Sequence, residues 1–155
     1  MKDLVFVLDV DGVMTTGQFL YSESGKEYKI FGPHDNDGLK MLKDKLEIEF
    51  ISADKRGFAV SSKRIVEDMG FNLSLVSSKE RYNYLQDKYG LSRIIYMADG
   101  FYDANILSDC LFGIAPQNAR VEAKIAADYV TPSESAKGAV LDACLKIINE
   151  FDNSQ

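Results

Sequence analysis

Acidic, hydroxyl and basic side chains in this sequence gather where short apolar runs end. The first such run, residues 4–8, is followed by two aspartates, and three later runs are also followed by polar groups. In an open parallel α/β sheet, ligands bind outside the carboxyl ends of the strands, so we expect these groups at one edge of the sheet. An aspartate there can also cap the next helix, and for Asp54 alone capping is the simpler interpretation. The candidate site residues are Asp9, Asp11, Ser52, Ala53, Asp54, Lys55, Lys79, Asp99 and Asp103.

The aspartates of this set are suited to binding a divalent cation. Asp9 and Asp11 lie two residues apart and can present one carboxylate and one backbone carbonyl to a common ion, and Asp99 adds an oxygen from another strand end. A few protein oxygens, with water and phosphate completing an octahedron, are typical of Mg²⁺ in phosphate chemistry. Such an ion reduces the repulsion between an anionic nucleophile and a phosphate group.

The remaining groups are suited to holding a phosphoryl group. Ser52 offers a hydroxyl and Lys79 a positive charge to the phosphate oxygens, where negative charge develops during transfer. Asp103 lies one helical turn past Asp99 and is expected on the same side. There it would hold Lys79 or a water molecule on the metal ion. The pattern therefore predicts a site for phosphoryl transfer.

Apolar runs alternate with amphipathic segments along the chain. This alternation predicts an α/β fold with a doubly wound, mostly parallel sheet that is covered by helices on both faces. The expected strands are residues 4–8, 48–51, 73–76, 94–97, 111–115 and 129–130. The expected helices are residues 37–45, 57–69, 79–89, 101–108, 121–127 and 138–151.

Residues 18–31 interrupt this alternation. Two β-type runs flank a polar turn that contains Gly25, a pattern typical of a β-hairpin. Because the hairpin follows the first strand directly, we expect a flap beside the site rather than an unrelated surface hairpin. Its aromatic side chains are expected to pack at a subunit interface rather than to form a ligand cage. They are Phe19, Tyr21, Tyr28 and Phe31.

Length and charge restrict the class of protein. The 155 residues are typical of one domain, which we expect to span residues 1–155. The net charge of −6 argues against sequence-independent binding to nucleic acid, which needs a basic surface. His34 is the single histidine, so a zinc site with several histidines is excluded. No apolar run reaches the ~18 residues of a membrane span, so no membrane association is expected.

Cys110 and Cys144 stand in apolar helical surroundings without CxxC spacing. We expect two reduced, buried thiols rather than a disulfide, as in a reducing compartment. The N-terminus carries no charged-then-apolar export signal. These features favour a cytoplasmic protein.

Taken in order, the candidate residues resemble the motifs of the haloacid dehalogenase (HAD) superfamily of phosphohydrolases. The matching segments are D-V-D-G-V-M-T at 9–15, I-S-A at 51–53, Lys79, and M-A-D-G-F-Y-D at 97–103. The resemblance implies that Asp9 is a nucleophile forming an aspartyl-phosphate, and that Asp11 protonates the leaving alcohol and then activates water. It further implies a phosphate site of Ser52 and Lys79 and a Mg²⁺ site of Asp9, the Asp11 carbonyl and Asp99, with Asp103 in support.

The chain has no cap domain beyond the hairpin. A short chain of this kind, with Y-S-E-S-G-K-E-Y-K-I-F at 21–31, is similar to the 3-deoxy-D-manno-octulosonate 8-phosphate phosphatase group. Relatives that act on nine-carbon sialic-type sugar phosphates look much the same. The resemblance implies a phosphatase for a small phosphorylated sugar acid, in the synthesis of lipopolysaccharide or sialic-type sugars. It also implies a homotetramer built by the hairpins, in which a neighbouring subunit closes the site.

Several positions depart from this group's pattern. Asp54 stands where the group usually has an arginine, which removes a cation for a substrate carboxylate from the pocket mouth. We expect His34 to be solvated, with substrate contact as the alternative. Candidates to replace the missing cation are Lys55, Arg56 and Lys137. The other departures are Ser78, Ala98, Gly100 and the tail at 133–138.

Two further classes compete with an enzyme. A signalling receiver domain is also small, acidic and doubly wound, but it needs an aspartate after the third strand, where this chain has S-S-K at 77–79. A catalytically silent relative could act as an oligomerisation or regulatory module, and Ala98 and the altered tail would suit it. Silent copies usually lose a catalytic aspartate, however, and none is missing here.

Overall fold

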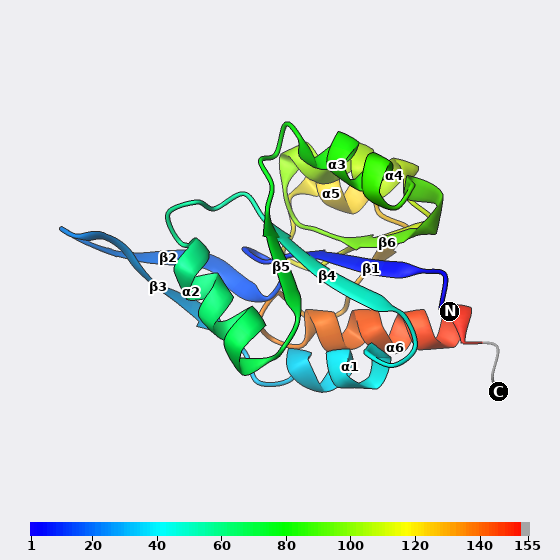
Figure 1. The fold of residues 1–155 in the computed structure, drawn as a ribbon, viewed down its shortest axis with the longest axis horizontal. Helices are drawn as coiled ribbons and strands as arrows, with labels where there is room; N and C mark the ends of the chain where they lie inside the picture. The colour runs from blue at the N-terminus through cyan, green and yellow to red at the C-terminus, as the bar shows by residue number, and fades with distance from the viewer. Residues whose placement is uncertain (153–155) are drawn as a thin grey trace.

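In the computed structural model, which describes residues 1–152, a parallel six-stranded sheet lies between two layers of helices (Figure 1). The strand order is β5-β4-β1-β6-β7-β8, and every neighbouring pair is parallel. The strands are β1 (Val5–Asp9), β4 (Glu47–Ser52), β5 (Asn72–Leu75), β6 (Ile94–Met97), β7 (Phe112–Ala115) and β8 (Tyr129–Val130). The doubly wound α/β sheet predicted from the sequence is therefore confirmed.

The first strand is central and buried on both faces. Phe6 and Leu8 belong to the apolar core beneath α1 (Asp35–Leu42) and α6 (Ala139–Phe151). Val5 and Val7 point to the opposite core, which is covered by helices α3 (Arg81–Lys88), α4 (Ala104–Asp109) and α5 (Val121–Ala126). Alternate side chains of a strand point to opposite faces, so a strand between two helical layers is apolar throughout.

Helix bounds differ from expectation in several places, and the helix expected at residues 37–45, for example, is α1 (Asp35–Leu42). Residues 57–69 form α2 (Phe58–Ser62) followed by a π-helical turn (Lys63–Asp68). The helix expected from residue 79 begins at residue 81. Residues 78–80 form a turn ahead of it, bridged by the Ser77 hydroxyl, which donates to the Glu80 carboxylate over 2.8 Å. The chain around Lys79 is therefore a turn, and this side chain is exposed.

The predicted hairpin is confirmed as an antiparallel pair, β2 (Thr15–Ser22) and β3 (Gly25–Phe31), which projects from the body (Figure 1). It starts three residues earlier than expected because Thr15 pairs with Phe31. Its aromatic residues separate, since Phe31 packs against the core while Tyr21 and Tyr28 are 60% and 63% exposed.

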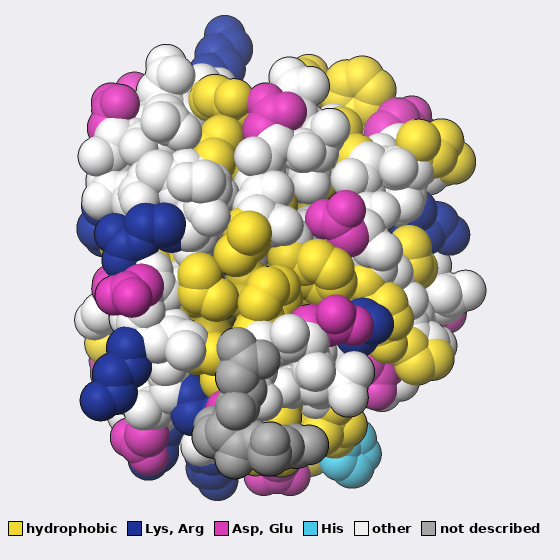
Figure 2. Space-filling model, turned by 90° about the vertical axis from the view of Figure 1, so that its right-hand side faces the viewer, with side chains coloured by type: hydrophobic (Ala, Val, Ile, Leu, Met, Phe, Trp, Pro, Cys, Tyr) yellow, Lys and Arg dark blue, Asp and Glu magenta, His cyan; other side chains and the backbone are white. Residues whose placement is uncertain are grey.

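Figure 2 shows the side of the molecule away from the hairpin, where apolar side chains meet near the centre and charged ones surround them. None of the helices in residues 1–152 is both long and apolar enough to cross a membrane. Cys144 is buried and Cys110 half-buried, and both thiols are free.

Candidate active site

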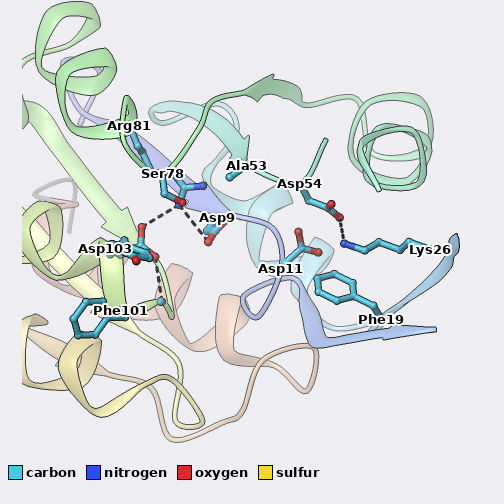
Figure 3. A pocket seen from close by; sticks show the side chains of 12 residues that line it. Asp9, Asp11, Phe19, Lys26, Ala53, Asp54, Ser78, Arg81, Phe101 and Asp103 are labelled. Atoms are coloured by element: carbon cyan, nitrogen blue, oxygen red, sulfur yellow. Dashed lines mark hydrogen bonds and ion pairs between the residues drawn. The ribbon is translucent and has the colours of Figure 1, made fainter. Parts of the chain in front are cut away.

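A pocket of 340 Å³ opens at the carboxyl ends of β1 and β4, between the hairpin and the segment that follows β6 (Figure 3). Charged side chains from five parts of the chain line it. They are Asp9, Asp11, Lys26, Asp54, Arg81 and Asp103. The pocket lies at the sheet edge where the sequence predicted a site.

Asp9 ends β1 at the floor of the pocket and is only 9% exposed. Its Oδ1 accepts a hydrogen bond from the Val10 amide over 2.8 Å, and its Oδ2 lies 3.3 Å from Nη1 of Arg81. Burial raises the pKa of the Asp9 carboxyl to about 6, although the Arg81 guanidinium opposes the shift. An oriented carboxylate of this kind can act as a nucleophile or a metal ligand.

The turn after β1 depends on a glycine. Gly12 has φ +81°, a left-handed conformation that favours glycine. A Cβ at this position would fall 2.0 Å from Oδ2 of Asp99. The Thr15 hydroxyl accepts hydrogen bonds from the amides of Gly12 and Gly17, each over 3.1 Å, and closes the turn. The glycine therefore allows Asp99 to lie against the turn beside Asp9.

Three carboxylates form a cluster that fits a divalent cation. Oxygen atoms of Asp9, Asp99 and Asp103 all lie within 4.8 Å of one another. Burial raises the pKa of Asp99 to about 7, and repulsion from Asp9 and Asp103 adds to the shift. Hard carboxylate oxygens are the ligands that Mg²⁺ prefers, and a cation would offset their mutual repulsion. Asp103 rather than the Asp11 side chain completes this trio.

The cation beside the cluster is Arg81, which is 4% exposed. Its Nη1 lies 2.9 Å from Oδ1 of Asp103 and donates to the Tyr96 hydroxyl over 3.2 Å. Tyr96, fully buried, donates in turn to Oδ1 of Asp103 over 2.7 Å. The first turn of α3 thus places a guanidinium, held by two other elements, against Asp9.

The sequence prediction for Lys79 is corrected here. Lys79 is exposed and lines a neighbouring hollow with Tyr82 instead of the pocket. Lys79 lies in the turn before α3, whereas Arg81 is the first residue of the helix and points inward to Asp9 and Asp103. The sequence analysis did not identify Arg81 as a site residue. The one indication in the sequence is that Arg81 is the next basic residue after Lys79.

The other predicted residues are divided between the pocket and the surface. Ser52 is fully buried at the end of β4, and its hydroxyl accepts a hydrogen bond from the Asp54 amide over 3.1 Å. Ala53 lines the pocket. Lys55 and His34 are exposed and are not part of the lining. Two further candidate cations are also exposed, namely Arg56 and Lys137.

The hairpin supplies two lysines that sequence reasoning missed. Asp54 Oδ2 lies 2.8 Å from Nζ of Lys26 and 2.9 Å from Nζ of Lys29. Burial alone would raise the pKa of Asp54, but these two ammonium groups hold it below its ordinary value. Nζ of Lys26 also lies 3.4 Å from the centroid of the Phe19 ring, a cation–π contact. The sequence did hold one indication of such cations, because an acidic chain that binds an anionic substrate needs a local basic patch.

No family model matches the sequence. A 3-deoxy-D-manno-octulosonate 8-phosphate phosphatase of Haemophilus influenzae is 30% identical over 145 residues, which cover 90% of this chain and 79% of the relative. The phosphatase of the same name from Salmonella typhi is 25% identical over 150 residues, covering 90% of this chain and 76% of the relative. The sequence likeness thus includes most of both chains.

Two solved structures are similar over nearly the whole chain. One is the 3-deoxy-D-manno-octulosonate 8-phosphate phosphatase of Moraxella catarrhalis in complex with a magnesium ion, a phosphate ion and a KDO molecule. It has a TM-score of 0.82 and 27% identity and covers 97% of this chain and 91% of its own. The other, from Legionella pneumophila, is described as a HAD superfamily (subfamily III A) hydrolase. Its TM-score is 0.83 at 25% identity, with 99% of this chain and 86% of its own covered.

Proposed function

Because this chain belongs to the 3-deoxy-D-manno-octulosonate 8-phosphate phosphatase family of the HAD superfamily, we propose that it is a Mg²⁺-dependent phosphatase for a small phosphorylated sugar acid. The observation that carries the proposal is the carboxylate trio of Asp9, Asp99 and Asp103, two of whose members, Asp9 and Asp103, line the pocket and pair with Arg81. This combination supplies a nucleophile, a metal site and a cation within reach of one phosphoryl group.

In the proposed reaction, a carboxylate oxygen of Asp9 attacks phosphorus and the ester P–O bond breaks, which leaves an aspartyl-phosphate. Asp11 gives its proton to the departing alkoxide. Asp11 then takes a proton from a water molecule whose oxygen attacks the same phosphorus. The acyl-phosphate bond breaks, inorganic phosphate leaves and Asp9 is regenerated.

The phosphoryl group is held by residues at the pocket floor. Asp9, Asp99 and the backbone carbonyl of Asp11 would hold Mg²⁺, with Asp103 in support. The bound ion supplies positive charge that lowers the repulsion between carboxylate and phosphate. Among residues 1–152, the buried Nε–H of Arg81 has no hydrogen-bond partner, so the guanidinium retains a donor for a phosphate oxygen. The Ser52 hydroxyl proton is the second donor that we propose.

The sugar moiety would lie between the hairpin and the segment after β6. Phe19 and Lys26 line one wall of the pocket, and Phe101 and Tyr102 line the other. We propose an eight-carbon 3-deoxy-octulosonate phosphate or a related nine-carbon keto-acid phosphate as substrate, supported by the names of the relatives. Asp54 does not make the mouth anionic, because Lys26 and Lys29 balance it together with Asp11.

The oligomer that we propose is a homotetramer assembled through the hairpin. Leu20, Tyr21, Tyr28 and Ile30 expose between 42% and 63% of their surface on this projecting element, which supports burial against another copy. Sedimentation of the double variant Tyr21→Ser, Tyr28→Ser tests this, since both side chains are exposed in one subunit. An unchanged sedimentation coefficient would argue against hairpin-mediated assembly. We further propose a cytoplasmic location, which the two free thiols support.

The first experiment is to measure phosphate release with Mg²⁺ and with EDTA over a panel of sugar phosphates that includes the eight- and nine-carbon keto acids. We expect a preference for one keto-acid phosphate that EDTA abolishes. Asp9→Asn should abolish release, whereas Asp87→Asn, at an exposed aspartate on α3, serves as the matched control. Activity on aryl phosphates alone would keep the mechanism and refute the substrate class. No activity on any phosphate would refute the proposal in favour of a silent module.

A further inference from the structure

Lys29 is the most completely enclosed cation of the hairpin. Its side chain has 0% exposure, and its ammonium meets three other segments of the chain. Nζ lies 2.8 Å from Oδ1 of Asp11 after β1 and 2.9 Å from Oδ2 of Asp54 after β4. It also donates a hydrogen bond to the Ser61 hydroxyl of α2 over 2.7 Å. All three donors of an ammonium group can be used in this arrangement, so its position is firmly fixed.

Asp11, in contrast, has few other constraints on its carboxylate. Within the part of the chain that the structure describes, Lys29 is its one ion-pair partner, and Oδ1 has no further hydrogen bond. Its backbone lies in the turn closed by Gly12 and Thr15, which fixes the main chain but not the side-chain rotamer. Figure 3 shows the Asp11 carboxylate in the half of the pocket near Asp54 and Lys26, apart from Asp9 and Asp103.

The second hairpin lysine provides an internal comparison. Lys26 pairs with the same Oδ2 of Asp54 over 2.8 Å and lies over the Phe19 ring, but it forms no ion pair with Asp11. The two lysines are therefore equivalent toward Asp54 and different toward Asp11. Lys29 differs from Lys26 in its ion pair with Asp11 and in its hydrogen bond to Ser61, and of these two partners only Asp11 takes part in the proposed proton transfer.

We propose that Lys29 is a positioning residue, which orients the Asp11 carboxyl for proton transfer to the leaving group. The inference rests on the proposed function, because it assigns a role toward the acid of that reaction. Lys29 touches neither Asp9 nor Arg81, so it acts through Asp11 rather than on the phosphoryl group. It also fastens the hairpin to the catalytic turn, which links the placement of the flap to the placement of the acid.

The test exploits the dependence of the reaction on the leaving group. Nitrophenolate leaves para-nitrophenyl phosphate without a proton, whereas the alkoxide of ribose 5-phosphate needs one. In Lys29→Met we expect kcat on ribose 5-phosphate to fall about 100-fold, within the range of general acid catalysis. The first-turnover burst of nitrophenol should stay within about threefold of the wild-type rate. Thermal melting of each variant establishes that it is folded.

Lys26→Met is the matched control. It should alter KM, but it should not slow the reaction of ribose 5-phosphate more than that of para-nitrophenyl phosphate. If Lys29→Met does not fold, Lys29→Gln, which keeps the length and a polar end, carries the same comparison. Equal slowing of both substrates, or the same separation in Lys26→Met, would overturn the role of Lys29. A wild-type protein that is inactive with Mg²⁺ on these two substrates and on the eight- and nine-carbon keto-acid phosphates would instead overturn the proposed function itself, so the two failures are distinguishable.

Discussion

Without its metal ion, the protein should lose stability as the pH rises from about 5 to about 8. The pKa values of Asp9 and Asp99 are about 6 and about 7 in the folded chain, against an ordinary 3.8. The folded state therefore binds protons more tightly than the unfolded state at these two carboxyls. Raising the pH removes those protons, and the buried charges then cost folding free energy.

The size of the loss follows from the two pKa values. Between pH ~5 and pH ~8, Asp9 contributes about 1 kcal/mol and Asp99 about 3 kcal/mol of lost stability. Repulsion between the two groups enters the shift of Asp99 alone, so the two contributions add to a combined loss of about 4 kcal/mol. For a chain of this size, the melting temperature should fall by roughly 10 °C. The pKa values of Glu49 and Asp54 are lowered, so their contributions change only in more acidic solution.

Thermal melts in EDTA and in saturating Mg²⁺ over this pH range provide the assay. A bound cation stabilises the ionised carboxylates, so Mg²⁺ should raise the melting temperature by several degrees at about pH 8 and little at about pH 5. Burial also raises the pKa of Asp35, which adds to the slope in EDTA but lies outside the trio and should not respond to Mg²⁺. Asp99→Asn should remove most of the Mg²⁺ response. A melting temperature in EDTA that is constant or rises with pH would refute the reasoning.

Three substitutions test other parts of the structure. Gly12→Ala places a Cβ 2.0 Å from Oδ2 of Asp99 at φ +81°, so Mg²⁺ should no longer raise the melting temperature; a retained shift would contradict the packing. Arg81→Lys keeps the charge but loses the planar guanidinium, and we expect about a tenfold loss in kcat/KM, with a far larger loss for Arg81→Met. Equal steady-state kinetics of wild type and Arg81→Met would exclude a role of Arg81 in phosphate binding. Oδ1 of Asp35 accepts a hydrogen bond from the Val140 amide at the start of α6 over 3.0 Å. Asp35→Ala should therefore lower the free energy of unfolding by about 1–2 kcal/mol, as measured by denaturant melts. A loss below about 0.5 kcal/mol would show that water replaces the Asp35 carboxylate at this helix start.

The sheet and its site edge could be predicted because they depend on local patterns. An apolar run such as residues 4–8 specifies a strand buried on both faces, and a polar residue directly after it must lie at the carboxyl end. Asp9 and Asp99 follow this rule and meet in the structure. These two residues meet because their strands, β1 and β6, are parallel neighbours in the sheet.

The cations could not be placed from the sequence in the same way. Whether Lys79 or Arg81 turns inward depends on the turn that leads into α3, since the two residues are two positions apart and Arg81 is the first residue of the helix. A two-residue shift rotates a helical position by about half a turn. Lys29 reaches the site from the hairpin through contacts with three separate segments. Such contacts depend on tertiary packing that no local pattern encodes.

The position of β1 in the sheet also has a consequence for biosynthesis. It leaves the ribosome before the other strands of this sheet, and its two neighbours, β4 and β6, are made after tens of further residues. The core that covers Phe6 and Leu8 includes side chains of α6, such as Ile147, at the far end of the chain. A nascent chain therefore carries an uncovered apolar strand until α6 has been made, and such strands are prone to aggregation. Chains truncated before α6 should accordingly depend on chaperones, whatever their catalytic residues.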